Sequence, residues 1–162
     1  MAKGKQSQGT PATVALTKAK VAFTTHAYEH DAAAKSYGLE AAEALGLAPE
    51  QVFKTLLVEV DGKLAVGVVP VDKQLDLKAI AAAAGGKKAV MADPAAAERT
   101  TGYVVGGISP IGQKRPLTTV VDSTATEHAT VYVSGGRRGL DIGLSPTDLI
   151  TVTKASTAAI AR

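Results

Sequence analysis

Two adjacent glycines in the middle of the chain could bring a ligand against the backbone. Gly106 and Gly107 lie within the stretch 102–112, and Ser109-Pro110 follows them and prevents any regular element from continuing. Glycine admits backbone angles that other residues avoid, and it lets a ligand approach main-chain N–H groups. We expect the stretch to begin as a strand and to become a loop at the glycines. An ordinary loop between two strands would show the same pattern.

Lys54 is a second candidate, because it lies in an apolar strand. In the predicted strand 52–60, alternation places Lys54 on one face with four aliphatic residues. Such a lysine must extend its ammonium to water, pair with a carboxylate or bind an anionic ligand, since burying an unpaired charge is costly. The hydroxyl of Thr55 lies on the opposite face. A lysine that only reaches solvent also fits this pattern.

A second glycine-rich turn carries a hydroxyl, a carboxylate and two arginines. Residues 132–141 place Ser134 and Asp141 seven positions apart, on either side of Gly135-Gly136. Arg137 and Arg138 lie between them and could contact phosphate. They could equally be solvated residues of a hairpin turn.

The histidines give weaker signals. His30 lies among acids in the segment 28–31, a setting more typical of a structural than of a catalytic histidine. His26 and His30 are four residues apart, but on a strand-to-loop segment rather than a helix, and no third ligand matches them. The sequence therefore does not predict a zinc site.

Nucleophilic catalysis by the chain itself has little support. A Ser/His/Asp hydrolase can be assembled on paper from Ser109 or Ser134, His30 or His128, and Asp141. No nucleophile-elbow motif supports that arrangement. The chain contains no cysteine, which excludes disulfides, thiolate metal sites and a cysteine nucleophile of its own.

Composition indicates one domain with an aliphatic core. Of the 162 residues, 46% are hydrophobic but only 4% are aromatic, so Ala, Val, Leu and Ile must fill the core. A net charge of +3 permits an RNA or phosphate partner without requiring one. No apolar run reaches the ~20 residues of a membrane helix. Residues 1–9 are polar and predict a disordered lead-in, residues 10–162 predict the domain, and cytoplasmic localisation fits this composition.

Helices and strands alternate irregularly along the chain. Thr10-Pro11, Asp76, Asp93-Pro94 and Ser145-Pro146 are typical helix starts, and Asp61-Gly62 indicates a two-residue hairpin. Predicted helices cover residues 11–20, 38–45, 77–84, 94–101, a short segment after 146, and the C-terminal tail. Predicted strands cover residues 23–28, 52–60, 64–69, 88–91, 117–121, 130–133, 139–144 and 151–153. This order predicts an α+β (mixed α/β) single domain rather than a doubly wound parallel sheet.

Several of these stretches together resemble one protein family. They are residues 28–31, 52–58, 74–78, 91–94, 102–114 and 132–142. In them the sequence resembles the YbaK-type Cys-tRNA(Pro) deacylases of bacteria, which are free-standing relatives of an editing domain found in some prolyl-tRNA synthetases. The resemblance runs from about Thr10 to the C-terminus, and it departs at the tight turn 61–63 and the alanine-rich loop 32–34.

The resemblance implies a compact domain around a strongly curved, barrel-like mixed sheet with surrounding helices. It implies an enzyme that releases cysteine from mischarged tRNA, chiefly the proline tRNA, without a metal or cofactor. Prolyl-tRNA synthetase is the implied partner, besides the acceptor end of the tRNA itself. The implied mechanism is substrate-assisted, because the thiol of the bound cysteine attacks its own ester carbonyl and leaves as a thiolactone.

Roles near the ester follow from the same resemblance. Lys54 would contact the terminal nucleotide or the reacting ester and stabilise negative charge, and Thr55 would support that contact. Gly106 and Gly107 would present backbone groups to the ester.

The remaining implied roles concern the amino acid and the tRNA phosphates. Ser134 and Asp141 would line the aminoacyl pocket, with Asp141 holding the α-ammonium or pairing with Lys54, and Tyr28 would shape the pocket. His30 stays structural. Candidates for phosphate contact are Lys114, Arg115 and Arg137. Two alternatives remain open: a deacylase for another small residue such as alanine, and a tRNA- or synthetase-binding module without turnover.

Overall fold

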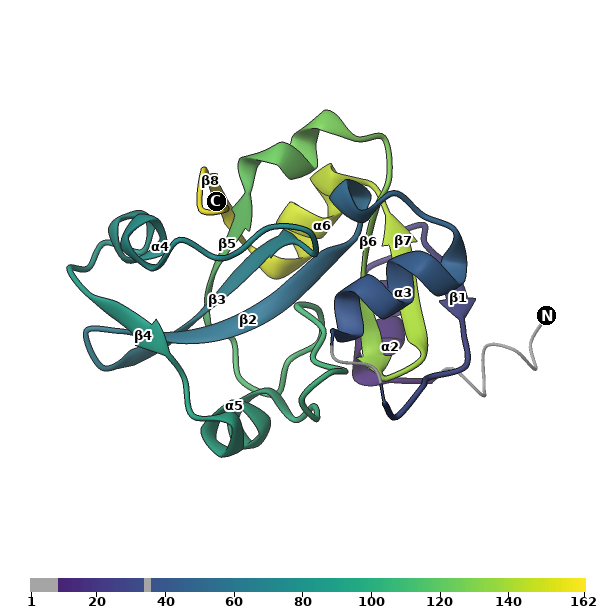
Figure 1. Ribbon diagram of the computed structural model, residues 1–162, viewed down its shortest axis with the longest axis horizontal. Helices are drawn as coiled ribbons and strands as arrows, with labels where there is room; N and C mark the ends of the chain where they lie inside the picture. Colours follow the sequence, from purple (N-terminus) through teal and green to yellow (C-terminus); the bar gives the residue numbers. More distant parts are fainter. Residues whose placement is uncertain (1–8, 34–35) are drawn as a thin grey trace.

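The computed structural model describes residues 9–33 and 36–162 (Figure 1). The predicted lead-in, residues 1–9, lies outside the described residues except for Gly9. Ala34 of the alanine-rich loop also lies outside them.

Two sheets carry the fold. The larger has the order β4-β2-β3-β5-β8, with β2 and β3 forming the antiparallel hairpin predicted at Asp61-Gly62. Its strands are β2 (Phe53–Val60), β3 (Lys63–Pro70), β4 (Ala89–Met91), β5 (Thr118–Asp122) and β8 (Ser156–Ala158). The smaller sheet has the order β1-β7-β6 and is antiparallel throughout. Its strands are β1 (Thr24–Ala27), β6 (Val131–Arg137) and β7 (Leu140–Leu144).

The two sheets meet where β2 begins. Val52, just before β2, forms a single parallel bridge with Tyr132 of β6, and its carbonyl accepts the N–H of Val71. A mixed α+β domain is thus confirmed. The barrel-like sheet is not found, because the strands of the described residues form two open sheets joined by this one bridge.

The helices begin where side chains can cap them. Thr10, Ser36, Asp76, Asp93 and Ser145 each accept a backbone N–H from the first turn of the helix that follows. The helices are α2 (Pro11–Lys18), α3 (Tyr37–Leu45), α4 (Leu77–Ala83), α5 (Pro94–Thr101) and α6 (Pro146–Thr153), with 3-10 turns η1 (Pro49–Gln51) and η2 (Ser123–Glu127). None of the helices in the described ranges is long and apolar enough to cross a membrane.

Strand β2 contributes to the core on both of its faces. Phe53 and Leu57 pack in the cluster that also holds the smaller sheet, α2 and α6. Val58 and Val60 pack on the opposite face, against Ile80 of α4. In the row predicted for Lys54, Val52, Val58 and Val60 are therefore buried, while Lys54 and Leu56 are partly exposed.

Three sequence predictions about local structure are wrong. The stretch 102–112 does not begin as a strand: Gly102 ends α5 in the left-handed region (φ 83), and the Gly107 N–H then donates to the Val104 carbonyl within a loop. At the C-terminus, residues 151–153 form the last turn of α6, and the tail is not helical but adds β8 beside β5. The Asp122 carboxylate accepts the N–H groups of Ile160 and Ala161, both at 2.9 Å, and so holds the tail extended.

Candidate functional site

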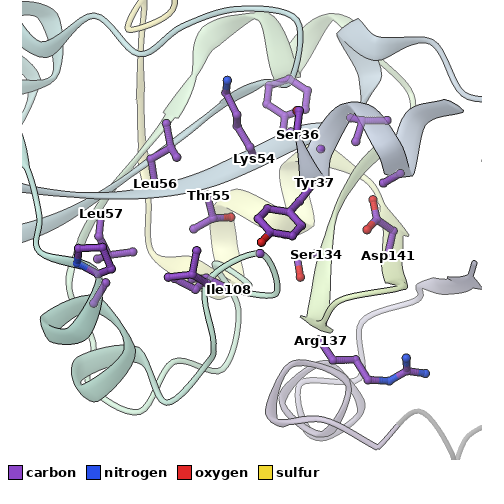
Figure 2. Close-up of a pocket in the computed structure, with 18 of the residues that line it drawn as sticks. Ser36, Tyr37, Lys54, Thr55, Leu56, Leu57, Ile108, Ser134, Arg137 and Asp141 are labelled. Carbon is purple, nitrogen blue, oxygen red and sulfur yellow. The ribbon is translucent and has the colours of Figure 1, made fainter. Parts of the chain in front are cut away.

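A pocket of about 380 Å³ opens between α3, the start of β2, α5 and the β6–β7 hairpin (Figure 2). One end is aliphatic and the other carries hydroxyl, carboxyl and guanidinium groups. The aliphatic residues include Leu56, Leu57, Met91, Pro94, Ala97 and Ile108, and the polar ones include Tyr28, Ser36, Ser134, Arg137 and Asp141. Lys54, Thr55 and Gly106 also line the pocket.

Asp141 is a buried carboxyl at the polar end. It lies directly opposite Ser134 in the β6–β7 ladder, which places both side chains on the face toward the pocket. Asp141 is only 5% exposed, and no hydrogen bond or ion pair to its carboxyl is found among the described residues. Burial raises the pKa of this carboxyl to about 7. A cationic ligand group would find here a carboxylate without a partner.

A β-bulge shapes the turn beyond Ser134. The register shifts between Ser134 and Arg137, and the Ser134 hydroxyl accepts the N–H of Gly136, whose φ is 109. Such a bulge changes the direction in which the following residues project. Arg137 lines the pocket from this position, although its side chain is otherwise exposed.

Tyr28 closes the pocket near Asp141. Its N–H donates to the Gly139 carbonyl, which anchors the end of β1 to the hairpin turn. Burial, and then the neighbouring Asp141, raise the pKa of the Tyr28 hydroxyl to about 12. The hydroxyl therefore stays protonated at neutral pH and can donate a hydrogen bond.

Thr55 and Lys54 project from opposite sides of β2 (Figure 2). The Thr55 hydroxyl oxygen is buried and has no hydrogen-bond partner among the described residues. Lys54 directs its ammonium away from Ser134 and Asp141 (Figure 2). Burial lowers the pKa of Lys54, and the nearby Asp72 offsets part of that effect. No Lys54–Asp141 ion pair occurs within the described part of the chain, so Lys54 is not the partner of that carboxylate.

Family comparison gives the site a context. A profile of the aminoacyl-tRNA editing domain matches residues 31–152, which include most of the pocket. The chain belongs to this family. Its pocket is therefore the pocket of an editing domain.

Relatives of this editing domain agree in sequence and in fold. EbsC of Enterococcus faecalis (strain ATCC 700802 / V583), an inferred Cys-tRNA(Pro)/Cys-tRNA(Cys) deacylase, is 37% identical over 99% of this chain and 98% of its own. The crystal structure of the hypothetical protein APE2540 matches with a TM-score of 0.84 and 25% identity, covering 94% of this chain and all of that one. An inferred trans-editing enzyme for prolyl-tRNA synthetase matches in fold, with a TM-score of 0.79, 23% identity and coverage of 94% and 95%.

The structure brings together most residues that the sequence singled out. Tyr28, Lys54, Thr55, Gly106, Ser134, Arg137 and Asp141 all line the pocket of the editing domain. Gly107 is buried beside it, and its N–H is already donated to Val104. Lys114 and Arg115 are exposed in the loop after α5 and do not line the pocket.

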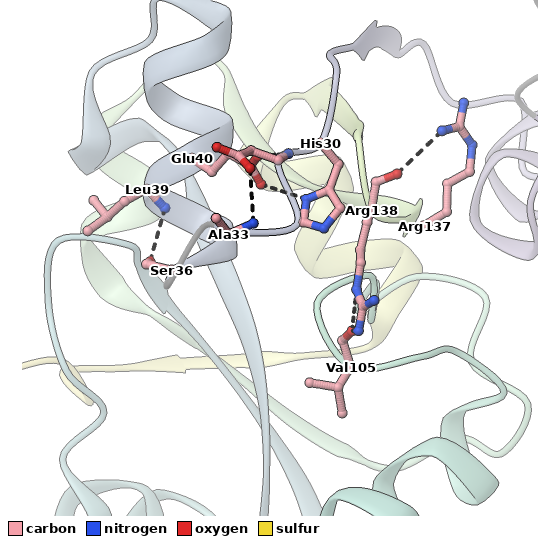
Figure 3. Close-up of polar contacts among 9 residues, drawn as sticks. His30, Ala33, Ser36, Leu39, Glu40, Val105, Arg137 and Arg138 are labelled. Atoms are coloured by element: carbon pink, nitrogen blue, oxygen red, sulfur yellow. Dashed lines mark hydrogen bonds and ion pairs between the residues drawn. The ribbon is translucent and has the colours of Figure 1, made fainter.

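The histidines lie elsewhere. His30 contacts Glu40 of α3 at 2.9 Å, which ties the loop after β1 to that helix, as the structural interpretation expected (Figure 3). None of the three histidines, all within the described ranges, lines the pocket. A Ser/His/Asp triad with Ser134 therefore has no histidine.

Sequence reasoning missed the specific role of Arg138. Its guanidinium donates to the Val105 carbonyl (Figure 3). It also lies 5.1 Å from the centre of the Tyr37 ring. The pair Arg137-Arg138 was visible as a candidate for phosphate contact, but only the folded hairpin shows that its second member holds the glycine loop.

Proposed function

We propose that this editing domain is an aminoacyl-tRNA deacylase that releases cysteine from mischarged Cys-tRNA(Pro) in the cytoplasm. The observation that carries the proposal is the pocket itself, where a buried carboxyl without a partner, an unpaired hydroxyl and a glycine loop converge. Family membership supports the aminoacyl-tRNA substrate, and the name of the E. faecalis relative supports cysteine.

The pocket suits a small amino acid esterified to a ribose. Its volume, about 380 Å³, leaves little room beside the terminal nucleoside. Cysteine and proline are similar in size, and a small difference in an apolar pocket is worth only ~1–3 kcal/mol, so a synthetase cannot reject cysteine by shape alone. A second site that removes cysteine after charging solves this problem.

Asp141 holds the α-ammonium in this proposal. A carboxylate and an ammonium compensate each other's charge in a buried site, and no cation of the described residues pairs with the buried Asp141 carboxyl. Ser134, directly opposite on β6, offers a second polar contact to the amino acid. Tyr28 closes this end of the pocket.

The ester carbonyl then lies near the glycine loop and β2. The N–H of Gly106 and the hydroxyl of Thr55 line this part of the pocket and can donate to its oxygen as negative charge develops. Lys54, whose ammonium is directed away from Asp141, binds the phosphate side of the terminal nucleotide (Figure 2). Its charge also stabilises the departing ribose oxygen.

The chemistry is supplied by the substrate. The cysteine thiol loses its proton, its sulfur forms a bond to the ester carbonyl carbon, and the bond to the ribose oxygen breaks. The ribose oxygen takes the proton, and the amino acid leaves as a thiolactone. The pocket contributes orientation and charge stabilisation. The chain contains no cysteine, and no histidine of the described residues lines the pocket, which fits a mechanism in which the substrate supplies the nucleophile.

A panel of mischarged tRNAs tests the proposal. Proline tRNA carrying cysteine, alanine, serine or proline is incubated with the protein, with and without prolyl-tRNA synthetase, and the remaining ester is measured. We expect cysteine to be released fastest, proline to be retained, and the synthetase to sharpen the choice of tRNA. Fast release of alanine would instead assign an alanine deacylase, and binding without release would assign a non-catalytic module. Equal rates for cysteine and serine would argue for attack by water.

A further inference from the structure

Val105, the residue before Gly106, is held on both of its backbone polar groups. The Val105 N–H donates to Oε2 of Glu98 in α5, at 2.8 Å. The Val105 carbonyl accepts two bonds from Arg138, from Nε at 2.9 Å and from Nη2 at 2.5 Å (Figure 3). A carboxylate from one element and a guanidinium from another thus fix a single residue of an otherwise irregular loop.

The hydrogen bonds from Arg138 to the Val105 carbonyl set the direction of the Gly106 N–H. The described residues contain no cis peptide bond, so the Val105 carbonyl and the Gly106 N–H point in opposite directions across one planar unit. With the carbonyl turned to Arg138, the N–H must face away from the guanidinium. No hydrogen-bond partner for that N–H is found in the described ranges of the chain, and Gly106 lines the pocket.

Arg138 is exposed, but its guanidinium lies close to both Gly106 and Tyr37. Gly106 has φ 90, and a Cβ added there would lie 2.8 Å from Arg138 Nε and 2.9 Å from Tyr37 Cε1. The guanidinium also lies over the Tyr37 ring, at 5.1 Å from its centre. Arg138 therefore joins the β6–β7 turn, the glycine loop and the start of α3.

We propose that Arg138 is a positioning residue for deacylation, which acts through the Val105 carbonyl to orient the Gly106 N–H toward the ester oxygen. The inference rests on the proposed function. A charged donor on the carbonyl also polarises the peptide and strengthens its N–H as a donor, because linked hydrogen bonds reinforce one another. Arg138 does not touch the substrate in this account.

The test compares Arg138→Ala and Arg138→Lys with wild type under multiple turnover of Cys-tRNA(Pro). Removing one preorganised donor to a developing oxyanion costs about 100- to 1,000-fold in kcat, and a misdirected donor should cost about 10- to 100-fold. We expect Arg138→Ala to lose that much kcat with KM within about twofold, because binding contacts stay in place. Lysine keeps the charge but has no bidentate fork, so it should restore only part of the rate. Arg99→Ala, at an exposed arginine outside the pocket lining, is the matched control.

A readout independent of turnover is the Gly106 amide resonance in a 15N–1H spectrum. It should shift in both Arg138 variants and stay in place in Arg99→Ala. An unshifted Gly106 amide, an unchanged kcat or a loss confined to KM would overturn the positioning role, the last pointing to a phosphate contact. If wild type releases no amino acid, the proposed function itself fails. If wild type is active and Arg138→Ala is equally active, only the role of Arg138 fails.

Discussion

Ser134 and Asp141 stand directly opposite each other on β6 and β7, and the carboxyl of the pair is almost fully buried. Burial raises the pKa of Asp141 to about 7, so ionising this carboxyl carries a cost that a bound ammonium would offset. This relationship links the stability of the domain to its proposed substrate.

The first prediction concerns stability and pH. The Asp141 carboxyl has a pKa of about 7 when folded and an ordinary value near 3.8 when unfolded, so the native state binds the proton more tightly. The free energy of unfolding gains from this tighter proton binding. The gain is complete below about pH 4 and is lost as pH rises through 7, since the carboxyl then ionises in a buried site. Asp141→Asn should remove this dependence and be more stable than wild type at pH 8, by up to about 4 kcal/mol.

Urea unfolding at pH 4.5 and pH 8 measures the difference between wild type and Asp141→Asn. The free energy of unfolding of Asp141→Asn, relative to wild type, should increase from pH 4.5 to pH 8. A constant difference would show that Asp141 does not titrate with a raised pKa, and the expected cost of ionising it in the folded protein would be wrong.

The second prediction separates stability from activity at Thr55. Thr55→Val keeps the shape but removes a buried hydroxyl that has no partner among the described residues. The variant should be as stable as wild type or more stable, by about 1 kcal/mol, because no protein hydrogen bond is lost. Cysteine release should fall about tenfold if the hydroxyl bonds the substrate.

Thermal unfolding and the deacylation rate check this pair of effects, with Thr55→Ser as the control that keeps the hydroxyl. A stability loss in Thr55→Val would reveal an internal partner for the hydroxyl. An unchanged rate would remove Thr55 from the site.

The third prediction concerns the charge at the mouth of the pocket. Lys54→Met preserves much of the length of the side chain but loses a charge that burial already disfavours. It should fold normally and lose most activity, about 100-fold, with a weaker dependence on salt, because a phosphate contact is gone. Lys54→Arg keeps the charge and should retain more of the rate. Equal activity in Lys54→Met and wild type would leave Lys54 a solvated strand residue.

Local signals in the sequence were enough for the parts of the fold that depend on neighbouring residues. Asp61-Gly62 formed the expected turn, and Ser145-Pro146 started the expected helix. The prediction of a helical tail was wrong, because contacts with residues far away in the sequence determine its structure. Its alanines favour a helix, but two hydrogen bonds to Asp122, 38 and 39 residues away, hold it extended. Contacts between residues so far apart in the sequence cannot be predicted from local helix propensity.

The candidate site shows the same limit. Strand alternation correctly separated Lys54 from Thr55, but it could not show that the Lys54 ammonium points away from Asp141. Nor could spacing assign Arg138 to the Val105 carbonyl, because the two residues lie 33 positions apart and meet only once the β6–β7 turn packs on the glycine loop. Residue types and the family resemblance together predicted part of the pocket lining, but Gly107, Lys114 and Arg115 do not line it, and only the folded chain shows which residues contact one another.

Cysteine editing is tested by the rate at which wild-type protein releases cysteine from Cys-tRNA(Pro), measured beside Pro-tRNA(Pro) and a no-protein control. We expect rapid loss of the cysteinyl ester and no acceleration for the prolyl ester. If the cysteinyl ester decayed only at the no-protein rate, while an active deacylase cleared the same preparation, the assignment of this pocket to cysteine editing would be contradicted.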